Sequence, residues 1–260
     1  MDQATVRVQI KALEAGCGVV DLDGWVATEV RGGDAEGWLN DLMTASVHTL
    51  RPDETVRSLL LGATGRIRAD FHVAPRDGGY LLLQGPGQPD RVAELLGPYV
   101  LSSDVELVAA GLDELALTPR PGPRWKIAAG DPGGLRAGPD AFEAWRVRHA
   151  IPAFPTDVDG DSLPAEAGLD EEPVIDRVKG CYLGQESVAR IRNSGHPTRL
   201  VVPVRAEAPI HTGDLVFSTG GPVGLVTSAD PLGTAAMLRI RWDARDSELM
   251  TKEGVALKRR

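Results

Sequence analysis

The sequence has few of the residues and segments that mark secreted, metal-binding or membrane proteins. Only two of its 260 residues are cysteines, Cys17 and Cys181, and they form no C-x-x-C pair. This argues against a disulfide framework and a cysteine-rich metal site. No segment approaches the roughly 18 consecutive apolar residues that a membrane-spanning helix needs, and residues 1–5 do not begin like an export signal. We therefore expect a cytoplasmic protein that is neither exported nor embedded in a membrane.

A surplus of basic residues is also missing. The chain has 28 Lys and Arg against 37 Asp and Glu, a formal net charge of −9, so we expect no direct binding to nucleic acid. The five histidines show no spacing of three or four residues, and we expect no metal site. Acidic residues alternate over 157–161 as in an EF-hand, but Ser162 and Gly168 stand where that loop needs glycine and glutamate. We expect a solvated turn there.

The remaining composition is that of a globular protein with a sizeable core, since 42% of the residues are hydrophobic. Helical and strand patterns mix without strict alternation, which indicates an α+β fold. Strands are expected at 26–30, 57–61, 67–73, 79–83 and 105–109, and helices after Asp34, at 90–96 and at 141–149. The glycines of 62–65 predict a hairpin, and 152–178 is expected to be a long irregular connection.

After Pro197 the hydrophobic pattern changes to that of short strands, at 200–205, 215–217, 223–227 and 235–242. Regularly spaced short strands favour a small antiparallel barrel. We therefore expect two domains, a core of residues 1–197 and a C-terminal β-barrel of residues 198–260.

The segment 179–190, Lys-Gly-Cys-Tyr-Leu-Gly-Gln-Glu-Ser-Val-Ala-Arg, carries the chemistry most visible in the sequence. Gly180 before it and the Asn-Ser-Gly-His-Pro run after it predict a helix over about 181–192. Cys181 is then expected in the first turn, where the helix dipole and the neighbouring Lys179 favour a thiolate with a lowered pKa. The alternative is a small buried hydrophobic residue.

This segment resembles the K-G-C-Y-x-G-Q-E signature of the YgfZ family, folate-binding proteins related to the aminomethyltransferase (T-protein) of the glycine cleavage system. Further segments resemble the family in the expected order, and nearly the whole chain is covered: 30–35, 59–67, 142–152, 163–169 and 223–228. The resemblance implies a folate-binding core of two interlocked α+β domains and a C-terminal β-barrel.

The resemblance also implies a function and a set of residues. It implies binding of tetrahydrofolate or a one-carbon derivative, and a role in assembling or repairing client iron–sulfur proteins, and thereby in tRNA modification. Lys179 and Cys181 match the basic residue and thiol of the signature, which Tyr182, Gln185, Glu186 and Arg190 complete. Glu166 is the expected pterin ligand, because one carboxylate can accept two adjacent N–H donors. Arg146 is a candidate for folate's glutamate tail.

Three functions remain open at the level of sequence. The first is the accessory role in iron–sulfur cluster assembly through Cys181. The second is a folate-dependent one-carbon transferase or demethylase, against which Ala69 counts, because aminomethyltransferases carry adjacent acids where this chain has Ala69 and Asp70. The third is a thiol-based interaction module whose folate pocket is vestigial. Whether the protein is an enzyme is therefore left undecided.

Overall fold

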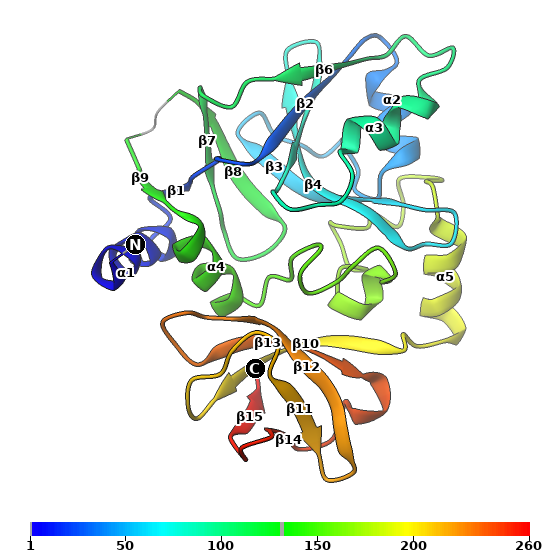
Figure 1. Cartoon of the computed structure of the whole chain (residues 1–260). Helices are drawn as coiled ribbons and strands as arrows, with labels where there is room; N and C mark the ends of the chain where they lie inside the picture. The colour runs from blue at the N-terminus through cyan, green and yellow to red at the C-terminus, as the bar shows by residue number, and fades with distance from the viewer. Residues whose placement is uncertain (1, 131–132) are drawn as a thin grey trace.

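The computed structural model describes residues 2–130 and 133–260, and their strands form three sheets (Figure 1). The largest is an antiparallel sheet with the strand order β6-β2-β5-β4-β3-β8-β7. Its strands are β2 (Val26–Arg31), β3 (Glu54–Leu61), β4 (Ile67–Arg76), β5 (Gly79–Gln84), β6 (Glu106–Ala110), β7 (Leu115–Thr118) and β8 (Arg124–Ala129). A separate parallel pair joins β1 (Gly18–Val20) to β9 (Leu135–Ala137).

The hairpin of β3 and β4 lies at the centre of this sheet, as the sequence predicts. Its turn is closed by a hydrogen bond from the Gly62 amide to the Arg66 carbonyl oxygen at 2.8 Å, and Gly65 has a φ of +75°, which favours glycine. Both strands are buried along most of their length, because helices cover both faces of the sheet. Arg57 pairs with His72 across the hairpin, so their side chains share one face of the sheet.

Helices form a layer on each side of the large sheet. The helices are α1 (Gln3–Glu14), α2 (Ala35–Leu42), α3 (Val92–Leu96), α4 (Pro139–Arg148) and α5 (Gln185–Ser194), with 3-10 turns η1 (Gly97–Tyr99), η2 (Pro164–Ala167) and η3 (Trp242–Ala244). One apolar core unites α1 and α4 with residues such as Trp125, and a second unites α2 and α3 with residues such as Phe71. The expected α+β class is confirmed.

The start of α5 differs from the sequence-based prediction. The helix begins at Gln185, not at Cys181, because Gly184 stands before it with a φ of +84°, outside the helical region. Cys181 therefore lies four residues before the helix, in irregular backbone. The first-turn position, on which the expected activation of the thiol rested, is wrong.

The C-terminal segment forms a closed antiparallel barrel, as predicted. Its order is β10-β13-β12-β11-β14-β15. The strands are β10 (Arg199–Ala206), β11 (Leu215–Ser218), β12 (Gly221–Ala229), β13 (Ala235–Arg241), β14 (Leu249–Thr251) and β15 (Ala256–Arg259), of which the sequence patterns missed the last two. The division of the chain into 1–197 and 198–260 stays a prediction.

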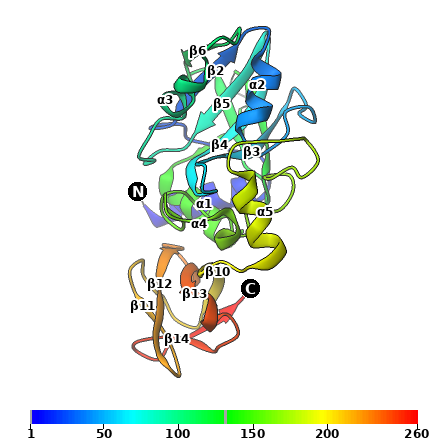
Figure 2. The same cartoon turned by 90° about the vertical axis from the view of Figure 1, so that its right-hand side faces the viewer.

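The barrel and the large sheet lie at opposite ends of the molecule, with α4 between them in both views (Figures 1 and 2). The segment between α4 and α5 is irregular except for η2, as expected for a long connection. Among the described helices, none has the length and apolar character that crossing a bilayer requires.

Candidate functional site

A cavity of about 450 Å³ lies between the large sheet and α4. Strands β3, β4, β5 and β8 supply its floor, α4 one wall, and the segments 20–25 and 151–156 its edges. This volume is within the usual range of small-molecule sites. The polar and aromatic side chains that line it are Asp21, Asp23, Trp25, Arg57, Asp70, Phe71, His72, Gln88, Trp125, Asp140, Phe142, Glu143, Arg146, Phe154 and Thr156.

Aromatic rings form much of the cavity wall. The ring of Phe142 meets Trp125 edge-on at 5.8 Å and lies 6.4 Å from the ring of Trp25. His72 stacks on Trp125 at 4.0 Å, and its Nδ1 lies 2.9 Å from the Thr55 hydroxyl oxygen. Burial, and secondarily the charge of Arg57, lower the pKa of His72 to about 3, so the ring is neutral at physiological pH. A flat ligand would find apolar faces here.

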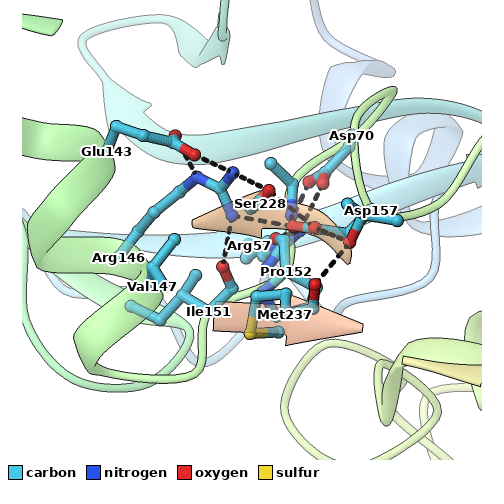
Figure 3. A network of polar contacts seen from close by, with 12 residues as sticks. Arg57, Asp70, Glu143, Arg146, Val147, Ile151, Pro152, Asp157, Ser228 and Met237 are labelled. Carbon is cyan, nitrogen blue, oxygen red and sulfur yellow. Dashed lines mark hydrogen bonds and ion pairs between the residues drawn. The ribbon is translucent and has the colours of Figure 1, made fainter. Parts of the chain in front are cut away.

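Arg57 and Asp70 form a buried ion pair on the cavity floor (Figure 3). Arg57 donates from Nε and Nη2 to the two carboxylate oxygens at 2.9 and 2.5 Å, and from Nη2 to the Pro152 carbonyl oxygen at 2.7 Å. Gln88 holds the backbone of Asp70 through its own amide group. Within residues 2–130 and 133–260, Arg57 Nη1 makes no hydrogen bond, so a nine-tenths buried guanidinium keeps two donors available.

Arg146 also lines the cavity, but its donors are taken. Nε and Nη2 each donate to Glu143 at 2.6 Å, Nη1 donates to Asp157 at 2.7 Å and to the Ile151 carbonyl at 3.1 Å, and Nη2 also donates to the Ser228 hydroxyl at 2.6 Å (Figure 3). All five N–H groups of a guanidinium are thereby used. Arg146 has no donor left for folate's glutamate tail, and its role in this geometry is to hold Glu143 in the cavity wall.

Asp157 connects this site to the barrel. Its side chain is fully buried; Oδ1 accepts hydrogen bonds from the hydroxyls of Thr227 and Ser228 in β12, at 2.5 and 2.7 Å, while Oδ2 accepts from Arg146 and from the Ala153 amide. The expected solvated turn at 157–161 is therefore wrong for Asp157, although the segment does turn and Asp161 is exposed. The alternating acids of this segment are typical of a surface turn. The residues that bury Asp157, Thr227 and Ser228, lie some 70 positions later in the sequence, so the local pattern could not indicate them.

Glu166 lies outside the residues that line the cavity. It is buried in η2 against the barrel, where Arg239 of β13 donates to its Oε2 at 3.5 Å. Burial raises the pKa of Glu166, which the charge of Arg239 partly opposes. Arg239 binds Asp159 more closely, at 2.6 Å, and its hydrogen bond is the first cause that holds the pKa of Asp159 at about 2. The expected contact of Glu166 with a pterin stays a prediction without support from this cavity.

Lys179 is directed at the end of α2 (Ala35–Leu42). Its ammonium donates to the carbonyl oxygens of Asn40, of Met43 at 2.6 Å and of Ala45 at 3.1 Å, groups left without partners where a helix ends. Burial lowers the pKa of Lys179 to about 8, against the opposing charges of Asp176 and Asp41. Lys179 therefore anchors the signature loop to α2, a role that its spacing from Cys181 did not indicate.

The remaining signature residues surround this anchored loop. Cys181 is exposed, and Tyr182 packs against the core cluster of Leu59, Phe154 and their neighbours. The Gln185 side chain accepts from the Tyr182 amide at 3.3 Å. Glu186 and Arg190 lie exposed on α5. The loop presents the Cys181 thiol to solvent, and Cys181 is not among the residues that line the cavity.

The signature and the cavity are thus two distinct features of the fold. The sequence pointed to the first and missed the second, whose aromatic walls combine Trp25 with Trp125 and Phe142, which follow it by 100 and 117 positions. Arg146 and Asp70, which the sequence analysis named individually, do line the cavity. The described residues contain no group of three or more His, Cys, Asp and Glu arranged to hold a metal ion.

Comparisons with known proteins give partial sequence matches and a full fold match. No protein-family model matches the chain. It is 36% identical over 67 residues to the mitochondrial iron-sulfur cluster assembly factor IBA57 homolog of Cryptococcus neoformans, which is 25% of this chain and 18% of that protein. It is 32% identical over 108 residues to the homolog of Aspergillus oryzae, 40% of this chain and 23% of that protein. The matches therefore span less than a quarter of these relatives' own lengths.

The fold match covers almost the whole chain. The crystal structure of the glycine cleavage system aminomethyltransferase T from Bartonella henselae superposes with a TM-score of 0.76 at 18% identity, over 96% of this chain and 88% of that one. The order of the core and the closed barrel is therefore that of the aminomethyltransferase fold. Together, the partial matches and the fold confirm the resemblance of this chain to the YgfZ and IBA57 type of protein.

Proposed function

We propose that this protein binds a reduced folate and acts as an accessory protein in iron–sulfur cluster assembly or repair. The observation that carries the folate part is the cavity beneath α4, with its aromatic walls and buried polar groups, in an aminomethyltransferase fold. The relatives named as iron-sulfur cluster assembly factors support the second part. Through such clients the protein would contribute to tRNA modification.

The lining of the cavity fits the pterin end of a folate. A pterin is flat, and the rings of Trp125 and Phe142, at 5.8 Å and nearly perpendicular, offer it a face and an edge. Its ring carries several N–H donors, and the carboxylates of Asp70 and Glu143 keep lone pairs beyond those that bind the two arginines. The free Nη1 of Arg57 can donate to a ring carbonyl. In this proposal these side chains bind and orient the ligand, which when bound supplies a carrier for one-carbon units.

Cys181 is the residue proposed to act on clients. Its thiol stands exposed on a loop that Lys179 anchors to α2, so it is accessible to another protein without rearrangement of the core. A thiolate there can act as a nucleophile, as a partner in a transient disulfide, or as a passing ligand to a cluster. Lys179, in this proposal, fixes the position of the loop.

A one-carbon transferase remains the second candidate, because the fold is that of an aminomethyltransferase. The site argues against it. Ala69, buried in β4, has no carboxyl group that could transfer a proton. Both carboxylate oxygens of Asp70 accept hydrogen bonds from Arg57, which holds this carboxylate in place. Transfer of one-carbon units from methylated amines to tetrahydrofolate would support this candidate, and no transfer across a broad amine panel would reject it.

Calorimetric titration of the protein with tetrahydrofolate, without oxygen, tests the folate part. We expect saturable one-to-one binding that weakens at least about tenfold in Phe142→Ala, which removes a ring from the wall. Phe217→Ala in the barrel strand β11 removes the same side chain at a position that does not line the cavity, and binding should be unchanged. If tetrahydrofolate does not bind the unaltered protein, the folate proposal is rejected. The protein would then be a thiol-based interaction module that acts through the exposed Cys181.

The accessory role is tested in a host that lacks its own protein of this type. Expression of this chain should restore the activity of iron–sulfur enzymes, and Cys181→Ser should not. Cys17→Ser is the matched control, because Cys17 is also an exposed free cysteine and is absent from the signature. Full restoration by Cys181→Ser would reject a role for this thiol.

A further inference from the structure

The charges around the cavity point to a preference among folates. Five carboxylates line it, those of Asp21, Asp23, Asp70, Asp140 and Glu143, against the two guanidiniums of Arg57 and Arg146. The guanidiniums are paired with Asp70 and with Glu143 and Asp157. Asp21, Asp23 and Asp140 form no ion pair with any residue in 2–130 and 133–260. Three carboxylates of the lining are therefore without an ion-pair partner in the part of the chain that the structure describes, although Arg91 and Arg136 line an adjoining hollow with Asp21 and Asp23.

These three residues form the solvent-exposed edge of the cavity lining. Asp23 and Asp140 are exposed and Asp21 is partly exposed, whereas Arg57, Asp70 and Arg146 are buried. The buried pair of Arg57 and Asp70 thus belongs to the floor, and the three carboxylates without an ion-pair partner belong to the rim. A second group of exposed charges of the opposite sign is missing among the lining residues, because His72 is buried and neutral.

We propose that the rim of Asp21, Asp23 and Asp140 makes the cavity select pterins by the length of their anionic tail: tail-free reduced pterins and monoglutamyl folate bind, and poly-γ-glutamyl folates are disfavoured. This inference rests on the proposed folate function. Each added γ-glutamyl unit brings one more carboxylate to the rim, and like charges at close range in a partly enclosed site repel. The ring itself, which carries no negative charge, meets only the aromatic walls and the polar floor.

Three ligands separate the outcomes in calorimetric titrations of the full chain: 6-methyltetrahydropterin, tetrahydrofolate and its penta-γ-glutamyl form. At about 0.01 M salt, where the Debye length is about 30 Å, we expect the pentaglutamate to bind about tenfold more weakly than the monoglutamate. At about 1 M salt, where the Debye length is about 3 Å, the difference should nearly vanish. The tail-free pterin should bind within a few fold of the monoglutamate at both salt concentrations.

Substitutions of the rim carboxylates test whether they cause the weaker binding of the pentaglutamate. Asp21→Asn, Asp23→Asn and Asp140→Asn combined should bring the pentaglutamate to the affinity of the monoglutamate at low salt. The matched control, Asp243→Asn, Asp246→Asn and Glu248→Gln, removes three exposed carboxylates from the barrel and should leave the difference intact. Asp140→Asn alone, at an exposed position in the first turn of α4, should close part of the gap even if the triple variant does not fold.

Two results would overturn the inference in distinguishable ways. If the unaltered protein binds the pentaglutamate as tightly as the monoglutamate or more tightly at low salt, the selectivity is rejected and the folate function stands. If none of the three ligands binds, the folate function itself is rejected, and the selectivity with it.

Discussion

Arg146 of α4 and Asp157 of the following connection are joined at 2.7 Å in a position that links the cavity to the barrel (Figure 3). The same aspartate accepts hydroxyl hydrogen bonds from Thr227 and Ser228 of the barrel. The one buried carboxylate of Asp157 therefore accepts hydrogen bonds from α4, from the loop after it and from β12. The two halves of the molecule are connected through it.

Replacing Asp157 with alanine is expected to destabilise the protein by about 3–5 kcal/mol, because it removes one of the two carboxylates that pair with the buried Arg146 and the acceptor of two buried hydroxyls. Chemical denaturation measures this loss. Asp161→Ala removes an exposed acid from the same segment and should change the free energy of unfolding by less than about 0.5 kcal/mol. Equal effects of the two substitutions would show that Asp157 is not the link described above.

The ion pair of Arg57 and Asp70 gives a second prediction. Asp70→Asn keeps the shape of the side chain but removes the charge that compensates a buried guanidinium, so we expect a loss of about 3–5 kcal/mol in the free energy of unfolding. Asp90→Asn is the control, since Asp90 pairs with Arg68 of the same strand in an exposed position at 3.3 Å. That pair should contribute less than about 1 kcal/mol.

The sequence predicted the elements whose residues interact locally. The hairpin at 54–76 follows from its glycine turn, and the barrel follows from its short alternating strands. Contacts between distant segments were not predictable in this way. The carbonyl partners of Lys179 lie more than 130 residues earlier in the sequence, and Asp157 is buried by barrel residues that follow it by some 70 positions. Local patterns carry no information on such partners, so the anchor of the signature loop was missed.

His72 gives a pH dependence with a defined sign. Its pKa is about 3 in the folded protein and near 6.5 when unfolded, so the unfolded state binds more protons below about pH 6.5 and stability falls as the pH falls. At 1.36 kcal/mol per unit, we expect a loss of about 2 kcal/mol at pH 5 relative to pH 7 from this group. Denaturation curves of His72→Gln should lack this component, and those of His211→Gln, an exposed histidine, should retain it.

Lys179→Met tests the anchoring role. The substitution leaves three carbonyl oxygens at the end of α2 without their donor, and we expect a loss of about 1–3 kcal/mol. Hydrogen exchange should speed up at the C-terminal end of α2 and in 174–184, while the barrel keeps its protection. Lys126→Met removes an exposed lysine of β8 and should leave both regions unchanged. Unaltered exchange in Lys179→Met would contradict the anchor.

Two glycines of the signature differ in a way that stability measurements can detect. Gly180 and Gly184 both have positive φ, +106° and +84°, so alanine is strained at either position. At Gly180 an added Cβ meets nothing within 4 Å, whereas at Gly184 it would lie 2.5 Å from the Gly62 carbonyl oxygen and 2.9 Å from the Leu61 side chain. We therefore expect Gly180→Ala to cost about 1–2 kcal/mol and Gly184→Ala distinctly more, because the start of α5 must also move away from the β3–β4 turn. Denaturation of the two variants in parallel decides the matter: equal losses would mean that α5 does not pack against that turn as the structure has it.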